Sequence, residues 1–436
     1  MAYKIDMKTA VAICLGAIIG DTLFVVTGIP IAQDGIFSLL GYVVVGIIAM
    51  LVAGNLGELS SMMPKAKGVA YSYASRAFGT ELGFVTGMLL YFGYCTTISA
   101  VSFGFAGYFL SLFGITVNLA YQIAVAALLI VSLSMLNMRG ITETAKLNQS
   151  LILIILFTVS LFVAFALLHG VQNGSAAFHA IGSNAPISDF TEAITTIVFA
   201  YAGFQVLTGL TDNVQGKGVG TSKAMIYSIL ISMVAFISIT IGIMLLVPNY
   251  SIDLNSQPLS TALSYVNAPA GISILIDMGI LVAIATATLT LIFTASRLVY
   301  QIGSDGLLPK ITRAFNKDTG VAINGIWISA VIEIVMLFSG NIYTILSISN
   351  FGIIFSWIMA CFALINMRRR QRHGSFMLPY YPYLSMIAIA GCLMFLFGLP
   401  RAVLALGVIL ILALLLVYST IAELKYRNVP RIRLFE

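Results

Sequence analysis

Apolar runs about as long as a membrane is thick dominate this chain of 436 residues. A helix needs about 20 apolar residues to cross the hydrocarbon core of a bilayer, which is about 30 Å thick. With 60% hydrophobic and 9% charged residues, the chain cannot form a water-soluble domain with a charged surface. We therefore predict an all-α membrane protein with 12 transmembrane helices, near residues 9–33, 36–57, 82–112, 118–137, 147–168, 190–211, 224–247, 270–302, 321–339, 343–366, 379–399 and 402–422.

Lysine and arginine sort to one side of this predicted arrangement. When the loops alternate across the membrane, 21 of the 22 Lys and Arg residues share a side with both termini, and only Arg401 lies opposite. Basic residues in short loops stay in the cytoplasm during insertion, so we expect a multi-pass protein of the cytoplasmic (cell) membrane with both termini in the cytoplasm. The net charge of +6 follows from this loop bias. It therefore indicates a lipid bilayer around the protein and no nucleic-acid partner.

Two predicted spans, the first and the sixth, are interrupted by glycines. The first contains Gly16 and Gly20, with Gly28 and Pro30 further on, and the sixth contains Gly203 and Gly209. Glycine-interrupted spans at matching positions of two halves point to the midplane site of a transporter built from inverted repeats. Freed amides at a half-helix start favour an anion, and freed carbonyls at a half-helix end favour an ammonium group, so an amino acid fits both. The alternative is that these glycines only allow close helix packing.

Other classes of function lack their sequence signals. The four cysteines, Cys14, Cys95, Cys361 and Cys392, lie in apolar runs without CxxC spacing, so we expect neither disulfides nor metal ligands. There is no GxxxxGK(S/T) loop for ATP hydrolysis, no repeated selectivity element typical of a channel, and no intramembrane cluster typical of an enzyme. We therefore expect no cofactor, no bound metal and no catalytic residues. A channel or a membrane-embedded enzyme is the disfavoured alternative from another class.

Five segments in order resemble the amino acid-polyamine-organocation (APC) superfamily. They are the GxxIGxGIF-like run from Gly16 to Phe24, the EL-x4-P-x3-G-x2-Y-x-Y segment from Glu58 to Tyr73, the turn from Asn137 to Gly140, the stretch from Phe199 to Phe204, and Ser296 to Pro309. The resemblance covers nearly the whole chain, 1–436, as one transporter domain. It implies a LeuT-type 5+5 inverted repeat with discontinuous helices 1 and 6, in which the repeats span about 9–168 and 190–366, and two further helices occupy about 379–422.

The resemblance also implies where a substrate would bind. Carried over by position, the backbone contacts fall on Ile18, Ile19, Gly20, Asp21 and Thr22 in the first span and on Phe199, Ala200, Tyr201, Ala202 and Gly203 in the sixth. Spans three and eight would supply side chains, with Tyr94, Thr97 and Ser99, or Ala287 and Leu291, as candidates. The alternative for Thr97 and Ser99 is that each hydroxyl bonds to its own helix.

Three residues depart from the family pattern. Asp21 stands where relatives have a small residue, Gln205 where many have a glutamate, and Ile155 near the position where many proton-coupled members have a lysine. An Asp at a helix centre costs about 2.5 to 3.5 kcal/mol on insertion, so Asp21 is the leading candidate proton carrier, unless it only caps the second half-helix. Without the lysine, Na+ is an alternative coupling ion, and Thr286 and Thr290, one turn apart, could add oxygen ligands unless their hydroxyls bond to their own backbone.

These features predict a secondary-active transporter of an amino acid or a related amine or polyamine. It would work by alternating access and be proton-coupled or an exchanger; the alternative is a Na+-coupled symporter of neutral amino acids. Asp21 favours a substrate that carries an extra cation or lacks a carboxylate, unless Asp21 is protonated when an ordinary amino acid binds. Glu333 is a second intramembrane carboxylate, but a structural hydrogen bond or an oligomer contact suffices for it, so we leave it outside the predicted site.

Overall fold

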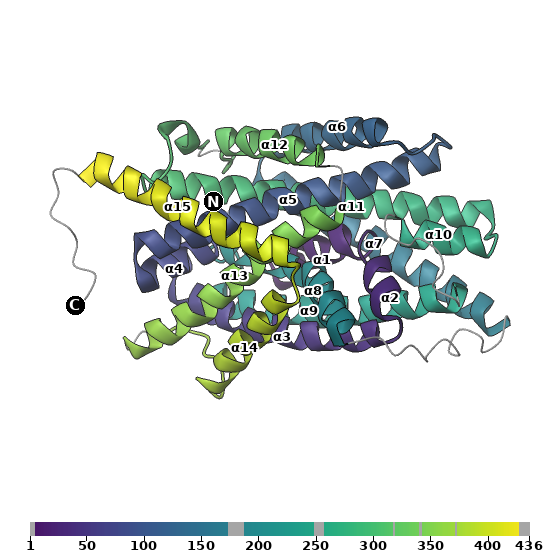
Figure 1. The fold of residues 1–436 in the computed structure, drawn as a ribbon, viewed down its shortest axis with the longest axis horizontal. Coiled ribbons are helices and arrows are strands. Elements are labelled where there is room, and N and C mark those ends of the chain that lie inside the picture. Colours follow the sequence, from purple (N-terminus) through teal and green to yellow (C-terminus); the bar gives the residue numbers. More distant parts are fainter. Residues whose placement is uncertain are drawn as a thin grey trace.

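The computed structural model describes residues 5–172, 187–247, 257–316, 319–339, 342–370 and 373–426. Within these ranges the chain forms helices and turns, and the only β contacts are two isolated bridges, Ile5 with Val214 and Asn316 with Val321. Figure 1 shows that most helices lie side by side along the long axis of the molecule, with α4 at one end and α10 at the other. The all-helical prediction is confirmed.

The helices follow the predicted apolar runs, with two short additions between them. In chain order they are α1 (Met7–Thr22), α2 (Gly28–Asp34), α3 (Phe37–Met62), α4 (Ala70–Phe78), α5 (Thr80–Leu112), α6 (Leu119–Asn137), α7 (Ile141–Gln172), α8 (Ile187–Tyr201), the 3-10 helix η2 (Ala202–Leu210), α9 (Lys217–Leu246), α10 (Pro258–Tyr265), α11 (Ala270–Ser304), the 3-10 helix η3 (Lys310–Arg313), α12 (Ile323–Leu337), α13 (Ile342–Arg369), α14 (Tyr383–Phe397) and α15 (Arg401–Tyr426). Sequence analysis did not predict the short helices α4 and α10, which lie between spans.

Length and composition mark most of these helices as membrane-spanning. In the described part of the chain, 9 helical segments are long and apolar enough to cross a bilayer, and shorter apolar helices lie at Met7–Gly20, Ile323–Leu337 and Tyr383–Phe397. The shorter three occupy the first, ninth and eleventh predicted runs. Helices at the periphery expose large apolar side chains such as Leu128, Phe397 and Leu416, as expected for surfaces in contact with lipid. The protein is therefore a multi-pass membrane protein.

The first predicted run is interrupted after Thr22. Helix α1 continues through Gly20, residues 23–27 form a turn, and α2 begins at Gly28. Pro30 lies in the first turn of α2, where a backbone amide would have no partner within the helix. The turn is held by the Tyr108 hydroxyl of α5, which donates to the carbonyl oxygen of Phe24 at 2.6 Å. The interruption is thus real, but it begins three residues beyond Gly20.

The sixth predicted run changes its hydrogen-bonding pattern at Ala202. The α-helix α8 ends at Tyr201, and the chain continues to Leu210 as the 3-10 helix η2. A 3-10 stretch of this length inside a spanning segment is uncommon, because its hydrogen bonds are poorer than those of an α-helix, and such stretches often mark functional hinges. The change falls within the segment Phe199–Gln205 that the sequence analysis singled out.

Helix α1 lies at the centre of the bundle. It packs against α7, α9, α11 and η2, and its residues from Ala12 to Gly20 are buried. Around it, α3 packs on α9, and α5 packs on both α11 and α13. The two interrupted segments therefore meet inside the bundle, away from lipid.

Segments far apart in the sequence meet at each end of the bundle. At one end the contacts are Ile5 with Asn213 and Gln215, Tyr71 with Asp305, and Glu58 with Arg368. At the other end they are Ser260 with Asp277 and Gly107 with Gln257. Loops that the sequence analysis assigns to one side of the membrane thus contact one another.

Candidate functional site

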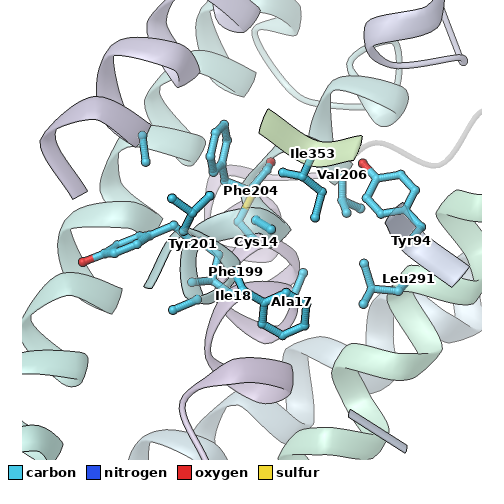
Figure 2. Close-up of a cluster of buried hydrophobic side chains, with 14 of the residues drawn as sticks. Cys14, Ala17, Ile18, Tyr94, Phe199, Tyr201, Phe204, Val206, Leu291 and Ile353 are labelled. Atoms are coloured by element: carbon cyan, nitrogen blue, oxygen red, sulfur yellow. The ribbon is translucent and has the colours of Figure 1, made fainter. Parts of the chain in front are cut away.

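The two interrupted segments cross at Ala17 and Gly203. A Cβ atom added to Gly203 would lie 2.3 Å from the Ala17 carbonyl oxygen, closer than atoms can approach, so only glycine fits there. Three residues earlier along α1, the Cys14 thiol donates to the Phe204 carbonyl oxygen at 3.7 Å. Figure 2 shows Cys14, Ala17 and Ile18 lying directly against Phe199, Tyr201 and Phe204. The predicted meeting of these two segments is present.

Helix α1 packs equally closely on α11. A Cβ atom on Gly20 would lie 2.3 Å from the Ala283 carbonyl oxygen and 3.0 Å from the Ala287 Cβ, and one on Gly16 would lie 3.4 Å from the Thr286 methyl carbon. Gly16 and Gly20 are one turn apart, so they form a small-residue face against α11. At Gly20 and Gly203 the geometry is therefore that of close helix packing, the alternative that the sequence left open.

A polar group from each of three elements meets beside this crossing. The Trp357 indole of α13 donates to the Gln205 side-chain oxygen at 2.8 Å, which fixes the orientation of that amide. The Gln205 Nε2 has no regular hydrogen bond within the described residues, and neither has the hydroxyl of Tyr94, with which Gln205 interacts. All three side chains are buried. A buried polar group without a regular hydrogen bond costs about 1 to 3 kcal/mol, so Tyr94 and Gln205 can receive a ligand or water.

Apolar side chains complete this region. Figure 2 shows Val206, Leu291 and Ile353 grouped around Tyr94, with Phe204 next to the crossing. Each of these side chains is at most 1% exposed, so the region is closed to solvent on both sides of the crossing. The region is therefore polar at Tyr94 and Gln205 and apolar beside the aliphatic side chains.

Tyr201 contributes its backbone and not its hydroxyl to this region. Its hydroxyl donates to the Tyr42 carbonyl oxygen of α3 at 2.9 Å, and its ring lies edge-on to Phe236 at 5.2 Å. The side chain points away from Tyr94 in Figure 2. The neighbouring positions Ile18, Ile19, Phe199, Ala200 and Ala202 are also buried.

The predicted hydroxyl groups bond to their own helices. Thr97 donates toward Gly93 and lies 2.6 Å from the Ser349 hydroxyl, and Ser99 bonds to Cys95. Thr286 donates to Val282 and Thr290 to Thr286. The alternative is therefore confirmed for Thr286 and Thr290, whereas Thr97 and Ser99 each have a second partner on another helix, Ser349 and the Glu333 carbonyl oxygen. Donation leaves the lone pairs of each oxygen, so it does not prevent a further contact with a cation.

Two predicted groups lie outside what the structure describes. Asp21 and Thr22 are the last two residues of α1, and their side chains are outside the described residues. The residue that precedes α2 is Thr27, so the alternative that Asp21 caps the second half-helix is wrong. The position of Ile155 is fully buried, in keeping with an apolar residue where relatives carry lysine.

Glu333 is buried between α12 and α5. It is 0% exposed, both of its carboxyl oxygens lack a hydrogen-bond partner in the described part of the chain, and the Ser99 hydroxyl binds its backbone oxygen, not its side chain. The sequence suggested a structural hydrogen bond or an oligomer contact for Glu333, and neither fits. The side chain makes no hydrogen bond to the described residues, and it does not reach the surface, where another copy of the protein could contact it.

Trp357 was missed by the sequence analysis. It holds Gln205 from a position 152 residues away in the chain. The sequence did contain one signal for Trp357. Tryptophan in membrane proteins is enriched at the membrane interfaces, whereas Trp357 stands in the middle of an apolar run.

The fold and this crossing define a polytopic transporter. Its sequence matches the family model described as amino acid permease over residues 5–424, so the chain belongs to the amino acid permease family, within the APC superfamily.

The chain is 25% identical over 405 residues to the methylthioribose transporter of Bacillus subtilis, covering 88% of this chain and 86% of that one. It is 25% identical over 425 residues to the branched-chain amino acid permease BcaP of Lactococcus lactis, covering 89% and 88%. It is also 25% identical over 397 residues to the serine/threonine exchanger SteT of Bacillus subtilis, covering 89% of each.

Proposed function

We propose that this permease carries an amino acid, or a related amine or polyamine, across the cytoplasmic membrane by secondary-active alternating access. The observation that carries the proposal is the crossing of α1 and η2 at Ala17 and Gly203, next to the buried polar groups of Tyr94 and Gln205. Binding at the crossing of two interrupted spans lets the same backbone groups face either side of the membrane as the bundle rocks. The proposed contacts are those carried over to the two spans, including Asp21 and Thr22.

The packing of the helices supports a two-fold repeat of five spans. If α1, α3, α5, α6 and α7 correspond to α8 with η2, α9, α11, α12 and α13, most contacts between helices have a counterpart; the extensive contact of α1 with α11 has no comparable one. The pair α5 and α13 corresponds to α11 and α7, α5 and α6 to α11 and α12, and α7 and α9 to α13 and α3. The contacts of α3 with α9 and of α5 with α11 each join two corresponding helices, so the repeat maps each of these pairs onto itself. We therefore assign a LeuT-type arrangement of 12 spans, with α14 and α15 outside the repeat.

The contacts at the two ends support the proposed topology. All loops assigned to the cytoplasm by their basic residues would lie at the α4 end, and the loop that contains α10 would lie outside. Both termini would then be cytoplasmic. The contacts of Ile5 with Asn213 and of Glu58 with Arg368 join such loops.

The names of the relatives guide the choice of ligands. They include a methylthioribose transporter, a branched-chain amino acid permease and a serine/threonine exchanger. A binding screen of the purified protein, read as a rise in melting temperature, should therefore contain these compounds, basic amino acids and polyamines. A ligand that binds only the folded state stabilises it by about 2.7 kcal/mol at 100 times its Kd. If no compound of these classes raises the melting temperature or is taken up by proteoliposomes, the proposal is wrong.

We propose that transport is coupled to a proton carried by Asp21, or that the protein exchanges one substrate molecule for another without a coupling ion. The alternative is Na+ held by carbonyls of α1 with the oxygens of Thr286 and Thr290. In the structure the Thr286 methyl group, and not its hydroxyl, faces Gly16 of α1, so this alternative requires the Thr286 side chain to rotate. Uptake into proteoliposomes with an imposed Na+ or pH gradient separates the cases. Stimulation by Na+ alone favours the threonine site, stimulation by a proton gradient favours Asp21, and indifference to both favours exchange.

A further inference from the structure

A small cavity lies between the 3-10 helix η2 and α11. Val206 and Gly209 of η2 form one wall, and Phe293, Thr294 and Arg297 of α11 form the other. Lys67, from the segment between α3 and α4, completes it, and a Cβ atom on Gly209 would lie 3.3 Å from the Lys67 carbonyl oxygen. The cavity itself has room for about one water molecule, and with the adjoining space open to solvent the volume is about 180 Å³.

Two positive side chains line this cavity. Arg297 is only 7% exposed, its guanidinium carbon lies 4.5 Å from the centre of the Phe293 ring, and one terminal nitrogen donates to the Gly320 carbonyl oxygen at 3.3 Å. Its Nε has no acceptor within the described ranges, and the ion pair found there joins Glu58 and Arg368 instead. Arg297 is therefore a buried cation without a carboxylate partner in the described structure.

Lys67 adds charge of the same sign. Its ammonium group lies 5.2 Å from the centre of the Phe315 ring. Burial, and next the positive charge of Arg297, lower the pKa of Lys67, while the charge of Asp212 opposes this effect. The exposed ammonium group of Lys67 and the buried guanidinium group of Arg297 repel each other, and an anion between them would remove that repulsion and supply the acceptor that the Arg297 Nε lacks.

The cavity adjoins the candidate substrate site. Val206 lines the cavity, and in Figure 2 the same side chain lies beside Tyr94 and Leu291. A molecule leaving that region toward the Lys67 end of the bundle would next meet the two cations.

We infer that Lys67 and Arg297 form a second, anion-binding site, which holds the carboxylate of the substrate in transit on the Lys67 side. This inference rests on the proposed function. An arginine fork pairs with a carboxylate through two parallel hydrogen bonds, and lysine adds a mobile charge, so the pair suits a carboxylate on a moving ligand.

The test uses Lys67→Gln in the full-length protein, with Lys65→Gln as a matched control that removes an exposed lysine two residues away. Half-saturating concentrations of the substrate found in the binding screen are measured in right-side-out and inside-out membrane vesicles. Lys67→Gln should raise the half-saturating concentration about three- to tenfold on the side of the membrane where Lys67 lies and leave it unchanged on the opposite side. For a decarboxylated analogue of the substrate it should change neither value. Arg297→Gln should act in the same direction where it folds, and Lys65→Gln should change neither face.

The contrary results distinguish a failure of the proposed function from a failure of the second site. Wild-type vesicles that transport no candidate substrate would count against the proposed function itself. If the wild type transports the substrate and Lys67→Gln has the same half-saturating concentrations as the wild type on both faces, only the second site is overturned. If acetate or chloride raises the melting temperature of the wild type but not of Lys67→Gln, while substrate half-saturation is unchanged, the site binds free anions and the role in transit is wrong.

Discussion

Gly203 of η2 lies against the Ala17 carbonyl of α1 so closely that a single added carbon would stand 2.3 Å from the oxygen. The two interrupted spans are therefore in direct backbone contact. This contact explains why a glycine stands there, and it changes the outcome expected for substitutions. A side chain would separate the helices before it could fill a ligand's space.

Gly203→Ala should lower both stability and substrate affinity. Overpacking of this kind typically costs about 1 to 3 kcal/mol, because the neighbouring backbone must move. Thermal unfolding and ligand binding of the purified protein measure the two effects. Gly271→Ala is the control, since a Cβ atom on Gly271 of α11 meets nothing within 4 Å. Equal melting temperatures and affinities for the two variants would show that the crossing tolerates a side chain. Gly203→Leu and Gly20→Leu should reduce expression as well as binding.

Arg368→Gln should destabilise the protein through Glu58. The Arg368 Nε donates to one Glu58 oxygen at 2.6 Å, the other Glu58 oxygen accepts from the Leu378 amide at 2.7 Å, and Glu58 is 0% exposed. Removing one partner of a buried pair costs about 3 to 5 kcal/mol, because the remaining charge is left in a dry environment. Melting temperatures measure the loss. Arg369→Gln, which removes an exposed neighbouring charge, should have little effect.

Glu58→Gln combined with Arg368→Gln provides the internal check on that ion pair. The double variant should lose less stability than the sum of the two single variants, because neither charge is then left alone. Additive losses would mean that the two side chains act independently.

Glu333→Met should make the protein more stable. The carboxyl group is buried without a partner among the described residues, and an apolar side chain of similar size removes that penalty of about 1 to 3 kcal/mol. The melting temperature should rise, whereas Glu81→Met on an exposed site should leave it unchanged. A lower melting temperature for Glu333→Met would show that the carboxyl group makes a contact that stabilises the fold.

Much of the fold could be predicted from the sequence because spanning length and basic-residue bias are local properties of the chain. The interruption in the sixth run was placed correctly for the same reason, since the change to a 3-10 helix falls in the glycine-containing segment. The role of Gly20 could not be predicted. Whether a glycine leaves room for a ligand or for the Ala283 backbone depends on which helix packs there, and this is set by the tertiary structure.

The side chains around the candidate site show the same limit. Thr97 was correctly expected to bond within its helix, because that bond needs only a carbonyl four residues earlier. The link between Gln205 and Trp357 joins two spans, and a single sequence carries no signal for that pairing. The cations Lys67 and Arg297 were counted only as charges that set topology, although they share a cavity next to the site.

Cysteine labelling should place the two sets of loops on opposite sides of the membrane. The background is a variant without Cys14, Cys95, Cys361 and Cys392, all of which are buried. Cysteines at Lys67, Lys223 and Arg369, which are exposed, should react from the cytoplasm, and those at Asn173 and Asn255, outside the described residues, from the exterior. Labelling of positions 173 and 369 from the same side would contradict the count of 12 spans and the repeat built on it.

Asp21→Asn should change both ligand choice and pH dependence. Asp21 lies in the last turn of α1, one residue before its end at Thr22 and next to the proposed backbone contacts, where a carboxylate repels a substrate carboxylate. The substrate therefore either carries an extra cation or lacks a carboxylate, or else Asp21 is protonated when it binds. Asparagine keeps the shape of the side chain while removing its charge and its titration. In the first case Asp21→Asn should weaken binding of the cationic ligand about tenfold or more, and in the second it should abolish stimulation by a proton gradient. Binding and uptake measured between about pH 5 and pH 8 distinguish these outcomes, since they cover the range in which a buried carboxyl can change charge. A variant with the affinity and the pH profile of the wild type would show that the Asp21 carboxyl group takes part in neither ligand choice nor proton coupling.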